Sequence, residues 1–306
     1  MANNILLGYD NAEGAKIPLF VGKEQGVFEK YGIVLAVERV SPVKLGTPRL
    51  LSGQLQFLMG NSGPVIEEIV VRQKRLAVIA SLGPARFAIF ADQAIRRPEE
   101  LKGRRFGVST PGASQDRIAR RALKKIGLEP KSDVEIVYTR FNNSTDRLKA
   151  LARGEIDATL AGLECDQELP GLEPKAARQL RRLIDLSELG IHISGSDIAL
   201  TRDYLEAHRD TVQRFLQALE KSIEVARESP DLVREAYEKY LQTGNSLLLE
   251  SKVKEYYKLA PSGRPFPDRL AIKNNLEELA EKYPDLSLPD VESCIDESPL
   301  LDLPER

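Results

Sequence analysis

The chain has 306 residues, enough for two domains that each bury a core of their own. Its 44 basic and 46 acidic residues give a formal net charge of −2, which excludes bulk nucleic-acid binding, because such binding needs a basic face. No apolar run reaches the roughly 18 residues that span a bilayer, and the segment after Met1 lacks the basic region that begins a signal peptide. We therefore expect either a cytoplasmic protein or the mature form of an exported one.

The first part of the chain alternates apolar runs with amphipathic segments, separated by short polar turns. This pattern is typical of an α/β sheet covered on both faces. A further apolar run, Phe87–Ala91, leads into the polar stretch Asp92–Glu100, where we place the first crossover into a second lobe. The predicted strands are Ile5–Gly8, Val34–Val40, Gln56–Met59 and Leu76–Leu82, and the predicted helices are Ile17–Lys30, Lys44–Leu51 and Gly63–Gln73.

The second part repeats this plan. Arg104–Val108 predicts a short buried strand, and a Gly/Ser/Pro turn separates it from the amphipathic helix Ser114–Ile126. Gly127 supplies the left-handed position that ends this helix. The segment Leu189–Asp197, rich in Gly and Ser, predicts the return crossover. The other elements predicted here are the strands Val134–Tyr138, Ile156–Leu160 and Arg182–Asp185 and the helix Ser144–Arg153.

After the return crossover the chain becomes helical. A strand at Ile198–Thr201 precedes a helix at Tyr204–Glu228, which carries an apolar stripe along one face. Two or three more helices are expected up to about Tyr283. The segment Pro284–Arg306 is rich in Pro, Asp and Leu and predicts an irregular tail.

Two internal matches indicate that the lobes are similar α/β units. LLSGQLQF at Leu50–Phe57 matches LARGEIDA at Leu151–Ala158, each a helix end, a glycine and a strand. A strand, a polar loop and a helix likewise open each half. We expect lobe I to comprise residues 1–89 and 196–306 and lobe II residues 90–195. The ligand site would lie in the cleft between them, since open α/β sheets bind ligands at the carboxyl ends of their strands.

Five stretches, in order and spacing, resemble the type II periplasmic binding proteins of ABC importers. The nearest branch is that of the sulfonate, taurine, nitrate and thiamine-pyrimidine-precursor binders. The resemblance extends from about Ile5 to Pro230. The stretches are PLFVGKEQGVFEKYGIVLAVERV, LLSGQLQFLMGNSGPVIEEI, ELKGRRFGVSTPGASQDRIARRALKKIGL, RLKALARGEIDATLAG and ALTRDYLEAHRDTVQRFLQALEKSIEVARESPD.

The resemblance implies two Rossmann-like lobes joined by two hinge crossovers, the type II periplasmic-binding-protein fold, with a helical C-terminal part. It also implies that a ligand is clamped between the lobes by loops that follow strands. In this sequence the matching loops are Tyr9–Asn11, Gly60–Ser62, Ser109–Ser114 and Ala161–Glu164.

The lobe I loops carry five candidate ligand contacts. The Tyr9 ring could form a wall of the site, with Asp10 or Asn11 as polar contacts; the alternative is an Asx turn that caps the next helix. Asp10 would disfavour an anion nearby and favour an amine. Asn61 and Ser62 follow a strand and either contact the ligand or cap the helix after them.

The lobe II loop predicts an anion site. It delivers hydroxyls and backbone N–H groups to a helix N-terminus, where the helix dipole favours negative charge. The alternative is an ordinary N-cap at Ser114 with a tight turn before it. The candidate contacts are Ser109, Thr110, Gly112, Ala113 and Ser114.

Three further candidates are isolated charged or titratable residues. Arg86 either is solvated or pairs with a carboxylate or sulfonate of the ligand. Glu164 is a cation contact or an exposed loop residue, and His192 lies in the return crossover, where it could face the cleft. No metal-binding, dinucleotide or P-loop motif occurs, so we expect no metal and no cofactor. Cys165 and Cys294 leave a disulfide open.

These observations favour the substrate-binding component of an ABC importer, which delivers a small polar organic solute, anionic or zwitterionic, to the importer's membrane subunits. We expect a monomer with no nucleic-acid partner, located in the periplasm or elsewhere outside the cytoplasm. A regulatory ligand-sensing lobe pair is a third, weaker candidate, since the chain carries no fused DNA-binding or kinase segment.

The alternative is a cytoplasmic enzyme on the same fold, similar to pyrimidine synthases, desulfinases or decarboxylases, that acts on a small organic acid. The residues argue against the known forms, because Gly60-Asn61 stands where the synthases place their lysine and Tyr9–Asn11 where a desulfinase places its cysteine. An acid–base enzyme that uses Glu164 or His192 stays open.

Overall fold

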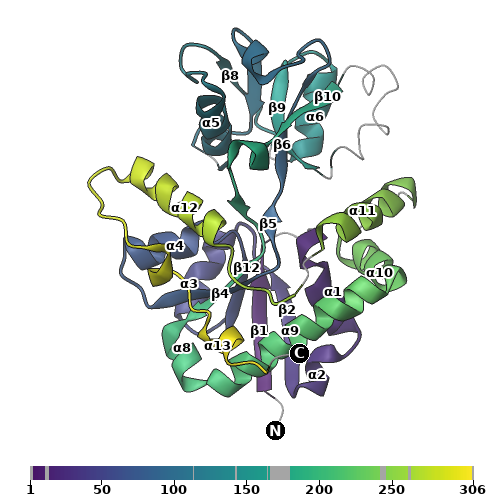
Figure 1. The fold of residues 1–306 in the computed structure, drawn as a ribbon, viewed down its shortest axis with the longest axis vertical. Helices are drawn as coiled ribbons and strands as arrows, with labels where there is room; N and C mark the ends of the chain where they lie inside the picture. The colour runs from purple at the N-terminus through teal and green to yellow at the C-terminus, as the bar shows by residue number, and fades with distance from the viewer. Residues whose placement is uncertain are drawn as a thin grey trace. The chain divides into compact units, whose positions relative to one another are not determined.

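The computed structural model describes residues 3–10, 14–112, 114–141, 143–163, 165, 180–241, 246–260 and 263–304. The chain forms two units (Figure 1): unit 1 comprises Met1–Ala85 with Ile193–Arg306, and unit 2 comprises Arg86–His192. The sequence predicts lobe boundaries between residues 89 and 90 and between residues 195 and 196. The units instead divide after Ala85 and His192, because Phe87 already pairs with Gly162 in unit 2, whereas Ile193 pairs with Ala85 in unit 1.

Unit 1 is built on a five-stranded sheet with the strand order β2-β1-β3-β12-β4. β1 runs parallel to β2 and β3, whereas β12, which returns from unit 2, is antiparallel to β3 and β4. The strands are β1 (Asn3–Tyr9), β2 (Ile33–Arg39), β3 (Phe57–Gly60), β4 (Leu76–Ser81) and β12 (Asp197–Thr201).

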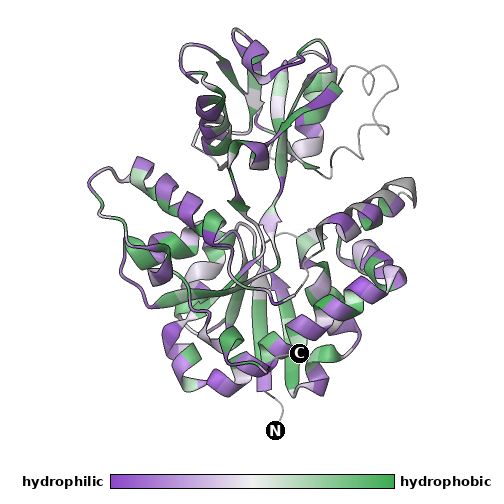
Figure 2. Ribbon diagram, in the orientation of Figure 1, coloured by the Kyte–Doolittle hydropathy of each residue, from purple (hydrophilic) through white to green (hydrophobic). Residues whose placement is uncertain are grey.

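Helices cover both faces of this sheet, and the alternation of side chains along each strand divides the core into two clusters. Phe57 and Met59 pack in one cluster with helices α1 and α9, whereas Leu58 packs in the other with α4 and α12. Figures 1 and 2 show these helices on opposite sides of the sheet, with apolar residues along the strands between them. The helices are α1 (Ile17–Glu24), α2 (Val27–Lys30), α3 (Gly46–Leu51), α4 (Gly63–Val70), α8 (Arg202–Ala207), α9 (Arg209–Glu228), α10 (Pro230–Leu241), α11 (Ser246–Leu259), α12 (Arg269–Lys282) and α13 (Ser298–Leu301).

Unit 2 has its own five-stranded sheet, with the strand order β10-β6-β9-β7-β8. β7 is parallel to β8 and β9, and β6 is antiparallel to β9 and β10. The strands are β6 (Phe87–Asp92), β7 (Arg105–Val108), β8 (Glu135–Tyr138), β9 (Ala158–Gly162) and β10 (Leu180–Asp185), and the helices are α5 (Ser114–Ile126) and α6 (Ser144–Ala152). A two-stranded pairing of β5 (Pro84–Ala85) with β11 (Ile193–Ser194) belongs to unit 1.

The two sheets have the same topology, which confirms the prediction of two similar α/β lobes. Each contains four strands that run in one direction and one antiparallel strand from a crossover, β12 in unit 1 and β6 in unit 2. The matched sequence pair falls at equivalent places. Gly53 follows α3 and Gly154 follows α6, and both adopt a left-handed φ, of 76° and 72°, before the next strand.

Several predicted elements were wrong in extent, among them the helix predicted at Gly63–Gln73, which ends at Val70. The helix predicted at Ile17–Lys30 is two helices, because Gly26 takes a left-handed φ of 62°. The helix predicted at Tyr204–Glu228 is interrupted at His208, whose φ is −132°. The strand predicted at Ile156–Leu160 pairs instead over Ala158–Gly162, since register with β6 decides its bounds.

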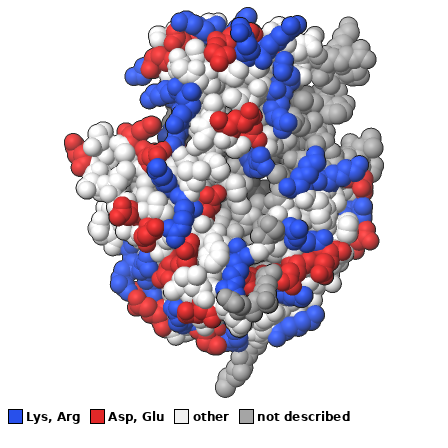
Figure 3. All heavy atoms as spheres, in the orientation of Figure 1, with Lys and Arg blue, Asp and Glu red and all other residues white. Residues whose placement is uncertain are grey.

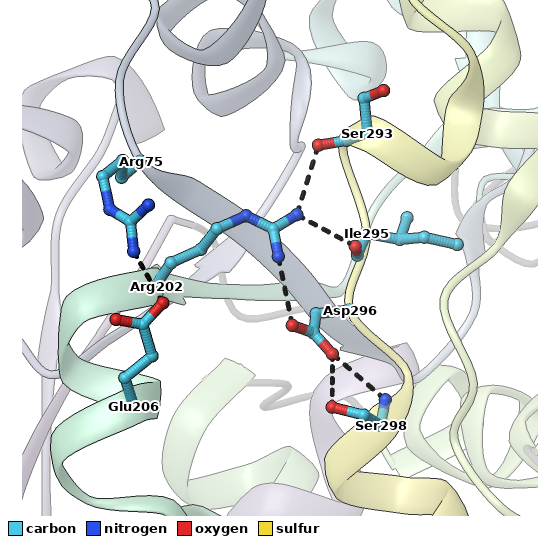
Figure 4. A network of polar contacts seen from close by, with 7 residues as sticks. All are labelled: Arg75, Arg202, Glu206, Ser293, Ile295, Asp296 and Ser298. Carbon is cyan, nitrogen blue, oxygen red and sulfur yellow. Dashed lines mark hydrogen bonds and ion pairs between the residues drawn. The ribbon is translucent and has the colours of Figure 1, made fainter.

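The predicted irregular tail is an ordered part of unit 1. Cys294 and Leu300 are fully buried, and the backbone of Val78 in β4 exchanges hydrogen bonds with Cys294 and Asp296. The guanidinium of Arg202 donates to the carbonyl oxygens of Ser293 and Ile295 and to the carboxylate of Asp296 (Figure 4). The tail therefore covers the edge strand β4.

Among the described residues, no helix has both the length and the apolar character needed to cross a membrane.

Candidate functional site

Three of the predicted lobe I residues meet at the carboxyl ends of β1 and β3. Asp10 follows β1, and its backbone N–H donates to the carbonyl of Met59. The Asp10 carboxylate in turn accepts a hydrogen bond from the backbone N–H of Asn61, at 3.3 Å. Gly60 permits this approach, because a Cβ at that position would lie 2.6 Å from the Asp10 carboxylate. Ser62, the next residue, is buried.

Lys16 is a residue of this candidate site that the sequence reasoning missed. Its side chain is fully buried, and its ammonium lies 3.0 Å from Asp10 Oδ1 and donates to the carbonyl of Gly195, at 3.1 Å. The ion pair balances the charge of Asp10, so the carboxylate is no longer an argument for an amine ligand. The one available signal was a lysine directly before the apolar run of α1.

A second buried cluster lies beside Asn61. The hydroxyls of Ser62 and Ser194 both donate to Asp197 Oδ2, at 2.6 and 2.5 Å, and Asn275 donates to the Ser62 hydroxyl. The Asn61 side chain donates to the carbonyl of Ser194. Burial raises the pKa of Asp197 above its usual value, although the hydrogen bonds from the serine hydroxyls act to lower it. Sequence reasoning identified this segment only as a crossover.

Tyr9 ends β1 and is half-buried. Its ring meets Phe20 edge-on at 5.3 Å, and Phe20 stacks on Tyr240 at 4.0 Å. Tyr9 therefore extends the helical core toward the loop that carries Asp10. Asn11 lies outside the described residues.

In unit 2, the predicted anion loop follows β7. Ser109 is buried, Thr110 and Gly112 are exposed, Ser114 begins α5, and Ala113 lies outside the described residues.

The loop already holds a carboxylate of its own. The backbone N–H of Gly112 donates to Asp116 Oδ2 at 2.8 Å, and Asp116 also pairs with Arg120. A carboxylate in the first turn is the internal equivalent of a bound anion at a helix N-terminus. This N–H group is therefore not available to a ligand in the way the sequence suggested.

The other predicted candidates lie elsewhere in unit 2. Arg86 pairs with Asp185 at 3.0 Å, so its charge is balanced within the unit. Burial opposes the ionisation of Asp185, but hydrogen bonds from Ser187 and the nearby charge of Arg86 hold its pKa below the usual value. His192 is half-buried at the end of the unit, and Glu164 lies outside the described residues.

Arg147 is a second residue that sequence reasoning missed. It is fully buried on α6 and donates to the carbonyl oxygens of Phe141, Asn143 and Leu160. Burial lowers its pKa to about 10. Arg147 therefore ties the loop after β8 to the middle of β9.

Two observations in the part of the chain described concern metal ligands and thiols. No three His, Cys, Asp or Glu side chains there are grouped so that they could hold a metal ion. Cys165 and Cys294 are both buried and are not joined as a disulfide. Burial raises the pKa of the Cys294 thiol to about 11, far from the range of a reactive thiolate.

The comparisons with known proteins agree with this architecture. No curated protein sequence matches the chain. The periplasmic aliphatic sulphonate-binding protein SsuA of Escherichia coli is similar in structure, with 17% identity, 97% of this chain and 92% of that chain covered, and a TM-score of 0.74. The periplasmic nitrate-binding protein NrtA of Synechocystis PCC 6803 has 13% identity, 98% and 88% coverage and a TM-score of 0.68.

A third similar structure is a DSZB mutant in complex with biphenyl-2-sulfinic acid, with 18% identity, 98% of both chains covered and a TM-score of 0.70. At these identities the likeness shows the fold, which is that of the periplasmic binding proteins. The sequence itself matches the profile described as NMT1/THI5 like over residues 14–232, most of the chain. The chain thus belongs to the NMT1/THI5-like family.

Proposed function

We propose that this protein is the substrate-binding component of an ABC importer and that it binds a small polar organic solute, anionic or zwitterionic. The family membership and the shared fold support this proposal, and so do the names of similar structures, which include sulphonate- and nitrate-binding proteins. Under this proposal the protein works outside the cytoplasm and delivers its solute to the importer's membrane subunits.

The observation that carries the proposal is the convergence of polar groups at the carboxyl edge of the unit 1 sheet. Asp10, Asn61 and Ser62 follow two different strands, and Lys16 and Ser194 join them from elsewhere in the chain. These groups form hydrogen bonds and an ion pair with one another, and these contacts fix the direction of their donors and acceptors. Such an edge is where open α/β sheets bind small molecules.

The proposed mechanism is closure around the solute without chemistry. A solute that touches groups of both units binds the closed arrangement more tightly than the open one and so shifts the equilibrium toward closure. The predicted contacts in unit 1 are Tyr9, Asp10, Asn11, Asn61 and Ser62, and those in unit 2 are Arg86, Ser109, Thr110, Gly112, Ala113, Ser114, Glu164 and His192. The pairs Lys16–Asp10 and Arg86–Asp185 make Asn61 the more favoured contact among these, since Ser62 is buried and its hydroxyl donates to Asp197.

An enzyme is the second candidate, because the similar DSZB structure holds an organic sulfinic acid. The cysteines and serines that the structure describes give less support to an enzyme. Cys165 and Cys294 are buried, and the hydroxyls of Ser62 and Ser194 donate to a carboxylate rather than to an imidazole base.

A thermal-shift screen with alkanesulfonates, taurine, nitrate and small carboxylates tests the proposal. A true ligand at a hundredfold excess over its dissociation constant should stabilise the fold by about 2.7 kcal/mol. The melting temperature should then rise by roughly 2–4 °C per kcal/mol. Mass spectrometry of the compound after incubation with stoichiometric protein should recover it unchanged. Conversion of the compound would move the assignment to an enzyme.

A further inference from the structure

Arg140 lies at the carboxyl edge of the unit 2 sheet, the edge at which open α/β sheets bind ligands. Arg140 follows β8 by two residues, and its backbone N–H donates to the carbonyl of Ser109, at 2.9 Å. Just before it, Thr139 donates both its N–H and its hydroxyl to the carbonyl of Val108, the last residue of β7. Arg140 is therefore fixed beside the Ser109 loop, at the joint end of two strands.

The backbone of Arg140 is strained. Its φ is 63°, a left-handed value that only Gln73 shares among the non-glycine residues described. The left-handed conformation costs a residue with a Cβ free energy that glycine does not pay, and such residues cluster at functional sites. An arginine kept where glycine would be more stable indicates that the side chain itself has a use.

The charge of Arg140 is also unbalanced. Its side chain is exposed, and within the described ranges it makes no ion pair, whereas Arg105 pairs with Asp157 and Arg120 with Asp116. Lys and Arg outnumber Asp and Glu in the sequence of unit 2, and Figure 3 shows basic side chains, with acidic ones among them, on its visible face.

A second arginine, whose charge no described carboxylate balances, is hydrogen-bonded to the same loop. Arg147 donates to the carbonyl of Phe141, the residue after Arg140. It has no carboxylate partner in the described part of the chain, and its buried Nε has no hydrogen-bond partner there. A buried cation without a counter-ion raises the positive potential at this edge and favours an anion nearby.

We infer that Arg140 is the side chain by which unit 2 binds an oxyanion of the solute, a sulfonate or a carboxylate. This inference rests on the proposed function and deepens it. The planar guanidinium offers paired donors that match such a group. The positive charge then comes from Arg140 and Arg147 and not from the N-terminus of α5, where Asp116 already accepts from the Gly112 N–H.

The first test compares Arg140→Gln with the wild-type protein by calorimetric titration. The probes are ethanesulfonate and its neutral analogue ethanesulfonamide. Loss of one charge-assisted hydrogen-bonded contact should weaken ethanesulfonate binding roughly 10- to 100-fold. Binding of the sulfonamide should change little.

A matched control is Arg104→Gln, which removes the same charge from an exposed arginine of the same unit, at the amino end of β7. It should leave the affinity for ethanesulfonate unchanged within about twofold, because exposed charges more than a Debye length apart are screened by salt.

The second test separates binding from folding. Arg140→Gly should raise the melting temperature, by roughly 2–4 °C, because glycine relieves the left-handed strain, and should still weaken ethanesulfonate binding. Gln73→Gly is the matched control, since it relieves the same kind of strain in unit 1. It should change stability without changing the affinity.

Equal binding of ethanesulfonate to wild type, Arg140→Gln and Arg104→Gln would overturn the inference and leave the proposed function standing. Wild-type binding of neutral probes but not of ethanesulfonate or small carboxylates would also overturn the inference, and of the proposed function it would leave only the binding of a small polar solute. If the wild-type protein binds none of the screened compounds, both the inference and the proposed function are contradicted.

Discussion

The ammonium of Lys16 lies 3.0 Å from the carboxylate of Asp10, and the Lys16 side chain is completely buried. The pair joins the end of β1 to the start of α1, and its lysine also holds the carbonyl of Gly195. The candidate site of unit 1 is therefore built around a balanced pair of charges.

Lys16→Met should destabilise the protein by about 3–5 kcal/mol, because it leaves the Asp10 carboxylate partly buried without its cation. Urea denaturation measures the change. The double variant Lys16→Met with Asp10→Asn should recover part of the loss, since it removes both charges. A loss below about 1 kcal/mol for Lys16→Met would mean that the pair contributes no more than an exposed salt bridge.

Asp197 should make stability depend on pH in an unusual direction. Because burial raises its pKa above the ordinary 3.8, the folded protein holds this proton more tightly than the unfolded chain does. The contribution of Asp197 to the free energy of unfolding therefore falls as the pH rises above 3.8, and it does so until the folded-state pKa is passed.

Asp197→Asn removes this titration and keeps an oxygen that accepts from Ser62 and Ser194. The stability of the variant relative to wild type should increase between about pH 4 and about pH 8. Urea denaturation at both pH values is the measurement. A stability difference that stays constant, or that shifts toward wild type with rising pH, would contradict the raised pKa.

Two arginines shown in Figure 4 should differ sharply in their effect on stability. Arg202→Gln breaks three contacts to the C-terminal segment, two of them partly buried, and should cost about 2 kcal/mol. Arg75→Gln breaks exposed pairs with Asp203 and Glu206 and should cost less than about 1 kcal/mol. Thermal or urea unfolding compares the two variants. Equal losses would show that the C-terminal segment depends on Arg202 no more than the surface depends on Arg75.

Much of the fold could be predicted from the sequence, because its signals are local. The apolar stripe of α9 contains Phe215 and Leu219, both fully buried, and glycine ends the helices before β3 and β9. The C-terminal segment could not be predicted this way. Its order comes from pairing with Val78, which is far away in the sequence, and no local pattern announces such a partner.

The site was predicted less completely, for a related reason. Asp10, Asn61 and Ser62 stand after apolar strands, a position that marks them in the sequence. Lys16, Arg140 and Arg147 stand within polar loops or helices, where an arginine or lysine is usually solvated. Only burial distinguishes Lys16 and Arg147, and only backbone conformation distinguishes Arg140.

Small-angle X-ray scattering of the full chain, with and without the best stabilising compound from the thermal-shift screen, tests the central claim that a solute closes the two units. If the claim holds, the radius of gyration falls on binding while the internal structure of each unit stays the same. A thermal shift with unchanged scattering would contradict the clamp mechanism, since binding would then leave the arrangement of the units as it was.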